Sequence, residues 1–143
     1  MSGSSPPPLR LFLDRCTQGT RFVAEIRRLV ADVETINDRY GVRPAERVRD
    51  PTWIADATRA GRILLGADQN ILRNRFERHA VCRNAARYIL YGNGNMPISM
   101  MVELFAANLP YIRNLTAVEG PWVYRIAQHG IDRRHLNCSD LEW

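Results

Sequence analysis

The sequence predicts an α/β protein, a single-domain three-layer α/β/α sandwich with a mostly parallel sheet of about five strands. Short apolar runs alternate along the chain with amphipathic helical segments, which is the order that βαβ units produce. The 143 residues suit one compact domain. We expect residues 1–8, rich in Gly, Ser and Pro, to form a disordered lead. Residues 9–130 would form the folded domain and residues 131–143 a peripheral tail.

The first half of the domain begins with an expected strand over residues 9–13, an apolar run that ends at Asp14. A helix is expected over residues 20–30, because apolar side chains recur there at spacings of three and four. The β-branched segment 33–38 is expected to be the second strand. Residues 39–51 are polar and rich in arginine, and we interpret them as a loop.

The second half begins with Asp50 and Pro51, an acidic cap followed by the proline of a first helical turn. This helix is expected to run to residue 60 and to end at Gly61. The third strand would cover residues 62–67 and end at Asp68. A polar loop is expected over 69–75, followed by a helix over 76–85 whose apolar residues are Phe76, Ala80 and Val81. A strand is expected over 88–91. The last elements are a long helix from residue 97 that is bent or interrupted at Pro110, and a strand over 122–126.

The cations of this chain are all arginine. Lys+Arg number 20 against 15 Asp+Glu, a formal net charge of +5, and lysine is absent from the sequence. A basic domain is compatible with nucleic-acid binding, although a modest surplus also fits an ordinary solvated surface. The absence of lysine excludes every mechanism that needs one.

The three cysteines, Cys16, Cys82 and Cys138, are widely spaced and odd in number. This pattern predicts no disulfide framework and favours a reducing compartment. No apolar run approaches the roughly 20 residues of a membrane span, and residues 1–8 lack the features of a signal peptide. We therefore expect a cytoplasmic protein without a membrane partner.

Three acids occupy similar places in the expected fold: Asp14 and Asp68 end strands, and Asp50 starts a helix. If these ends converge, their like charges need a cation, and oxygen ligands suit Mg²⁺ or Mn²⁺. Such a site activates water for phosphate chemistry. The alternative is that the acids merely end strands and cap a helix, which is common.

Other chemistries find less support. Phosphatases and receiver domains with strand-end aspartates typically use a lysine, and no P-loop motif is present. His129, His135 and Cys138 match no standard zinc spacing. Cys16 has no evident base in the sequence.

The motifs around the three acids together resemble the PIN-like domains, most closely the compact bacterial group of VapC-like toxins. The similarity lies in the order and spacing of Leu11-Phe12-Leu13-Asp14-Arg15, of Asp50-Pro51-Thr52-Trp53-Ile54 and of the run from Gly61 to Asp68, followed by a late Gly-Asn turn before a helix. The resemblance implies a metal-dependent ribonuclease in which Asp14, Asp50 and Asp68 bind Mg²⁺ or Mn²⁺. Candidates for a fourth acid are Glu25, Asp38, Glu46 and Asp56.

The third motif departs from that family, because Ala67 precedes Asp68 where relatives commonly carry a Lys or Arg beside the acid. Arginines would then have to bind the substrate phosphate, and Arg15 and Arg73 are the ones nearest to the acids in sequence. This departure puts catalytic strength, more than the fold, in question.

The leading hypothesis is a metal-dependent endoribonuclease, the toxin half of a toxin–antitoxin pair, with an RNA substrate and a small antitoxin protein as partner. The alternative is a PIN-like module that no longer cleaves and instead binds RNA or a protein. A phosphatase-like hydrolase is a more distant third. Met96, Met100 and Met101 fit core packing best, with a homo-oligomer or antitoxin surface as the alternative.

Overall fold

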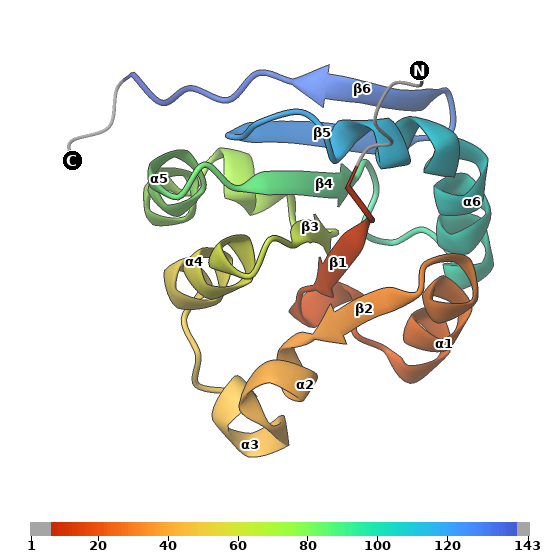
Figure 1. Cartoon of the computed structure of the whole chain (residues 1–143), viewed down its shortest axis with the longest axis horizontal. Coiled ribbons are helices and arrows are strands. Elements are labelled where there is room, and N and C mark those ends of the chain that lie inside the picture. Colours follow the sequence, from red (N-terminus) through yellow and green to blue (C-terminus); the bar gives the residue numbers. More distant parts are fainter. Residues whose placement is uncertain (1–6, 140–143) are drawn as a thin grey trace.

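The chain folds around a six-stranded sheet with the order β2-β1-β3-β4-β5-β6 (Figure 1). The computed structural model describes residues 7–139, apart from the side chains of Cys16 and Gln69. The strands are β1 (Arg10–Leu13), β2 (Asp32–Thr35), β3 (Ile63–Gly66), β4 (Arg87–Tyr91), β5 (Trp122–Ala127) and β6 (Gly130–Arg134). The helices are α1 (Thr20–Leu29), α2 (Ile36–Tyr40), α3 (Val42–Ala45), α4 (Asp50–Arg59), α5 (Arg75–Arg83) and α6 (Ile98–Leu115), with 3-10 turns η1 (Arg15–Thr17) and η2 (Gln69–Leu72).

Helices cover both faces of this sheet, so the predicted three-layer α/β/α fold is confirmed. Strands β2, β1, β3, β4 and β5 are parallel, and β6 runs antiparallel to β5. Helices α1 and α6 pack on one face, and α4 and α5 lie on the other (Figure 1). In β1 the alternating side chains serve both layers, because Leu11 and Leu13 join the first core and Phe12 joins the second.

The chain reverses its direction of travel across the sheet at β1. It passes from β1 to β2 on one side and then crosses back to place β3 on the other side of β1. In an open parallel sheet, a crevice forms outside the carboxyl ends of the two strands at such a switch point, and ligands bind there. The carboxyl ends of β1 and β3 are followed by Asp14 and Asp68, so the topology places both acids at this crevice.

The second expected strand, over 33–38, is wrong in its second half. Strand β2 ends at Thr35, and Ile36 begins α2. Thr35 and Asp38 form a capping box: Thr35 Oγ1 accepts from the Asp38 amide at 3.0 Å, and the Asp38 carboxylate accepts from the Thr35 amide at 2.9 Å. Because these bonds satisfy two amides of the helix start, the cap overrides the β-branched composition of the segment.

Of the bend or interruption expected at Pro110, the interruption does not occur, because α6 is one helix that contains Pro110 in its interior. Its methionines pack inward. Met96, just before the helix, and Met101 are buried in the first core, and Met100 packs against that core. These contacts support the interpretation of the methionines as core residues.

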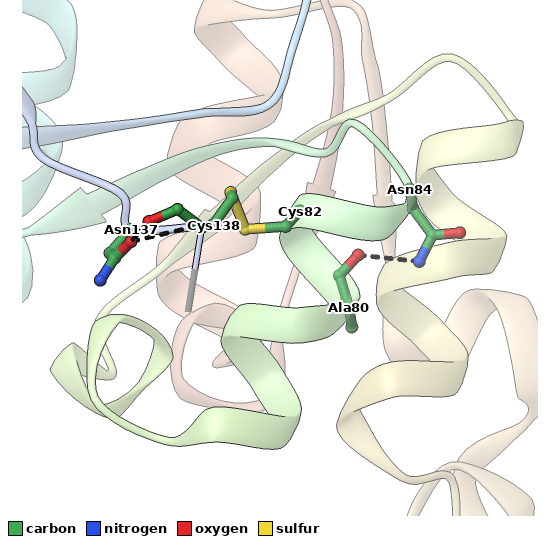
Figure 2. Close-up of a disulfide and its surroundings, with 6 residues drawn as sticks. Ala80, Cys82, Asn84, Asn137 and Cys138 are labelled. Carbon is green, nitrogen blue, oxygen red and sulfur yellow. Dashed lines mark hydrogen bonds between the residues drawn. A yellow bond between two sulfur atoms is a disulfide. The ribbon is translucent and has the colours of Figure 1, made fainter. Parts of the chain in front are cut away.

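Within the expected tail of residues 131–143, the structure describes the chain as far as residue 139. Gly130–Arg134 forms the edge strand β6, and Cys138 is joined to Cys82 of α5 by a disulfide. Figure 2 shows this bond beside Asn84, whose side-chain amide donates to the Ala80 carbonyl at 2.8 Å at the end of α5. The expectation of no disulfide is therefore wrong, because the fold brings together two cysteines that lie 56 residues apart in sequence.

None of the helices between residues 7 and 139 has the length and apolar character that a bilayer crossing requires.

Candidate active site

An acidic pocket of about 140 Å³ lies at the crevice outside β1 and β3. The acids that line it are Asp14, Asp50, Asp68 and Glu77, and the other lining residues are Arg15, Trp53, Ile71 and Tyr88. The fold thus brings the three acids singled out by the sequence into one pocket. It adds a fourth carboxylate from α5.

Asp14 forms the floor of this site and is held from two sides. The residue is 4% exposed. Oδ1 accepts a hydrogen bond from Thr17 Oγ1 at 3.1 Å, and Oδ2 accepts one from the Tyr88 hydroxyl at 2.8 Å. The Thr17 hydroxyl also lies 2.8 Å from the Leu65 carbonyl and has one hydrogen to share between the two acceptors, so Tyr88 is the stronger constraint on where Asp14 points.

Gly66, the last residue of β3, makes room for this arrangement. A Cβ at position 66 would overlap the carboxylate of Asp14 and the hydroxyl of Tyr88. The glycine is therefore needed for close approach of side chains across the sheet.

Asp50 enters the pocket from the first turn of α4. It was expected to be the helix cap, but Arg49 occupies the cap position and Asp50 is the first helical residue. Its Oδ1 accepts from Trp53 Nε1 at 2.8 Å and from Arg15 Nη1 at 3.0 Å. Burial works to raise the pKa of Asp50, but hydrogen bonds from Glu77, Trp53 and Arg15 outweigh it and hold the pKa below its usual value.

The two arginines expected to grip phosphate have different positions. Arg15 lines the pocket, but its guanidinium is committed to Asp50 and to the carbonyls of Ala45, at 2.8 Å, and Val48. It therefore ties the segment after α3 to the site and orients Asp50. Arg73 follows η2 directly, is exposed and lies outside the residues that line the pocket.

Glu77, in the first turn of α5, is the acid that the sequence analysis missed. Burial, a hydrogen bond with Asp50 and the charges of Asp50, Asp68 and Asp14 together raise its pKa to about 8, with burial as the largest cause. At neutral pH a proton on Glu77 thus relieves the repulsion among these carboxylates. In sequence Glu77 is one polar residue in an amphipathic helix, and only the position of α5 against α4 reveals its role.

The four other candidates for a fourth acid lie outside the residues that line the pocket, and three of them have partners elsewhere. Asp38 belongs to the α2 capping box and pairs with Arg27, and Asp56 pairs with Arg59 and accepts from the Tyr40 hydroxyl. Glu25 lies 3.7 Å from Arg28 on α1. Glu46 lines a neighbouring cleft.

The donor chemistry of the pocket fits a hard divalent ion, because four carboxylates supply the oxygen ligands that Mg²⁺ and Mn²⁺ prefer. Within residues 7–139, however, no three His, Cys, Asp or Glu side chains are grouped closely enough to hold a metal. The side-chain oxygens are engaged with protein donors instead; Asp68, for example, accepts from the Asn70 amide at 2.9 Å. Binding would require these carboxylates to move toward one another.

A mostly parallel sheet covered by helices on both faces, with an acidic pocket at its switch point, defines the class of this domain as a three-layer α/β/α fold. The chain belongs to the PIN-like domains: the family model described as "PIN like domain" matches residues 9–93, more than half of the chain. The matched segment contains all four acids of the pocket. Searches of curated proteins and of solved structures return no match.

Proposed function

We propose that this protein is a metal-dependent endoribonuclease that hydrolyses RNA phosphodiesters at the acidic pocket. The observation that supports this most is the convergence of Asp14, Asp50, Asp68 and Glu77 from different elements on one pocket. Membership of the PIN-like family points in the same direction, because PIN-like domains are generally nucleases.

In this proposal the four carboxylates hold Mg²⁺ or Mn²⁺. A divalent ion at such a site activates water and stabilises the charge that develops on phosphate. The chain itself orients the ligands: Thr17 and Tyr88 fix Asp14, and Arg15 and Trp53 fix Asp50. Arg73 is exposed, follows Asp68 by five residues in sequence, and is proposed to contact the RNA backbone.

The biological role proposed is that of a toxin in a toxin–antitoxin pair, on the strength of the VapC-like motifs. The partners in this proposal are RNA, a small antitoxin protein and a second copy of the chain. A cytoplasmic location is part of it. The Cys82–Cys138 disulfide argues against that location, since such bonds are typical of oxidising compartments.

The test is cleavage of a labelled RNA by the purified protein with Mg²⁺ or Mn²⁺. We expect cleavage by the wild type and none by Asp14→Asn, which removes one ligand charge. Asp56→Asn serves as the control, because Asp56 lies outside the pocket, and it should cleave normally. Cleavage that persists in Asp14→Asn or without metal would contradict the mechanism.

A second candidate function is a binding module that does not cleave. It is favoured by the protein donors that already occupy Asp14 and Asp68 and by the absence of a grouped metal site among the described residues. Titration calorimetry separates the two: Mg²⁺ or Mn²⁺ uptake that Asp14→Asn abolishes supports the nuclease. RNA affinity without metal uptake supports the binding module.

A further inference from the structure

A second cleft, of about 730 Å³, adjoins the acidic pocket. The two share Arg15, Asp50 and Glu77 as lining residues. They are therefore adjacent, and one extended ligand can occupy both. The far side of this cleft is formed by the segment between α3 and α4, which carries Arg47 and Arg49, and by the start of α5. We refer to it as the arginine cleft.

The aromatic residue of the arginine cleft is Phe76, which is 76% exposed. The sequence indicated Phe76 as one of the apolar residues of its helix, but the residues that α5 buries are Ala80, Val81 and Cys82. The side chain of Asn74 caps α5 by accepting from the amides of Phe76 and Glu77 at 2.9 and 3.1 Å. This cap fixes the backbone on which Phe76 faces the cleft and Glu77 the pocket.

The arginine cleft is lined by Arg15, Arg47 and Arg49 and by the acids Glu46, Asp50 and Glu77, and the groups in it that suit a polyanion are the two arginines without an ion pair among the described residues. Arg47 and Arg49 are exposed and form no ion pair with any residue that the structure describes. Arg15, in contrast, is paired with Asp50. The guanidinium groups of Arg47 and Arg49 therefore remain available for phosphate oxygens, which arginine binds with two parallel hydrogen bonds.

We propose that the arginine cleft binds single-stranded RNA next to the acidic pocket, with a base stacked on Phe76 and phosphates on Arg47 and Arg49. The proposal rests on the proposed function for its substrate and adds the residues that select an unpaired strand. Stacking on an aromatic ring requires a base that is free of its own stack, so a duplex cannot use Phe76. The cleft thus accounts for a preference for unpaired over paired RNA.

The experiment measures binding of a fluorescent single-stranded oligoribonucleotide by anisotropy in EDTA, so that cleavage plays no part. Phe76→Ala is expected to weaken binding by roughly 5- to 150-fold, the effect of losing one stacked base. Phe76→Leu should weaken it similarly, and Phe76→Trp should retain it. Thermal unfolding checks that these exposed-site variants keep the fold.

The arginines are tested by the salt dependence of the same binding. Arg47→Gln with Arg49→Gln should make the slope of log affinity against log salt less steep by roughly 1.4, because two phosphate contacts are lost. The matched control is Arg21→Gln with Arg28→Gln, which removes the same charge from exposed positions on α1, across the sheet from the cleft. That control should leave the slope unchanged.

Two outcomes would overturn the proposal: Phe76→Ala binding single-stranded RNA as tightly as the wild type, or blunt duplex RNA binding as tightly as the single strand. Either result would mean that the exposed Phe76 contacts a protein partner and not RNA. These results are distinguishable from failure of the nuclease, because RNA that binds through Phe76 and is never cut would leave the cleft intact and contradict only the proposed function.

Discussion

Glu77 and Asp50 share one hydrogen bond in a pocket with two further carboxylates. The protonation of this pair determines how much negative charge the pocket carries. The pKa of Glu77 is raised to about 8 by burial and by the neighbouring acids, while that of Asp50 is lowered by its donors. One carboxyl therefore holds a proton where its neighbour is charged. A divalent cation bound among these groups would take over the role of that proton.

The stability of the metal-free protein should consequently fall as pH rises through the pKa of Glu77. A carboxyl with a raised folded-state pKa contributes stability that is complete below its unfolded pKa of about 4.5 and is lost as pH passes about 8. The melting temperature is expected to decline between about pH 4.5 and pH 8 and to level off above that, because only in this range does the folded chain hold a proton that the unfolded chain has lost. Mg²⁺ should reverse the decline.

Glu77→Gln is the matched variant for this measurement, since it keeps the shape of the side chain and cannot ionise. Its melting temperature should depend less on pH over that range and should exceed the wild-type value at the alkaline end. An identical pH dependence in both proteins would show that Glu77 does not titrate there.

Gly66 has no side chain, and this leaves room for the side chains of Asp14 and Tyr88 to meet in the site. In Gly66→Ala the new methyl group would overlap the Asp14 carboxylate and the Tyr88 hydroxyl. We expect a loss of about 1–3 kcal/mol in the free energy of unfolding, the usual cost of overpacking, together with loss of RNA cleavage. Gly19→Ala is the control, because a Cβ at position 19 has no atom within 4 Å. Urea denaturation of both variants measures the difference.

At the scale of single elements, short-range signals account for what the sequence predicts well. Helix α1 follows from its apolar spacing, and β1 and β3 follow from apolar runs that end beside acids. Helix α2 is the instructive failure, because Thr35-Ile36-Asn37-Asp38 also carries a capping-box spacing. The cap supplies two hydrogen bonds, to the amides of Thr35 and Asp38, whereas β-branched composition is only a weak preference.

The capping box is open to a direct test. Thr35→Ala removes the oxygen that accepts from the Asp38 amide, and loss of such a cap costs about 1 kcal/mol. The free energy of unfolding from urea titration should fall by that amount. Thr52→Ala, at an exposed position in the first turn of α4, should change it much less. Equal effects of the two substitutions would mean that the cap adds nothing beyond a general Thr-to-Ala change.

At the scale of the whole molecule, the disulfide joins the C-terminal segment to the helix that carries Glu77. Cys82 lies near the end of α5 away from Glu77, and Cys138 follows the edge strand β6 (Figure 2). The bond closes a loop of 56 residues that contains β4, α6, β5 and β6. It thus links the last part of the sheet to the layer that forms the pocket.

Reduction should therefore destabilise the protein as a whole. Loop-closure entropy for this separation corresponds to about 4 kcal/mol, and measured values are typically about 2–4 kcal/mol. Reductant is expected to lower the denaturation midpoint of the wild type and to leave the Cys82→Ser/Cys138→Ser variant unchanged. A wild-type midpoint that does not respond to reductant would contradict a stabilising role for the bond.

The sequence by itself determined the α/β class, the order of most elements and the positions of Asp14, Asp50 and Asp68 at strand ends and at a helix start. These features follow from periodicity and from residues close together in the chain. Only the tertiary structure decided that Glu77 joins those acids, that Arg15 is held by Asp50, that Phe76 faces solvent beside the pocket and that Cys82 meets Cys138. Each of these depends on which segments pack against one another, because the strand order and the placement of α5 bring together residues that local sequence patterns treat as unrelated.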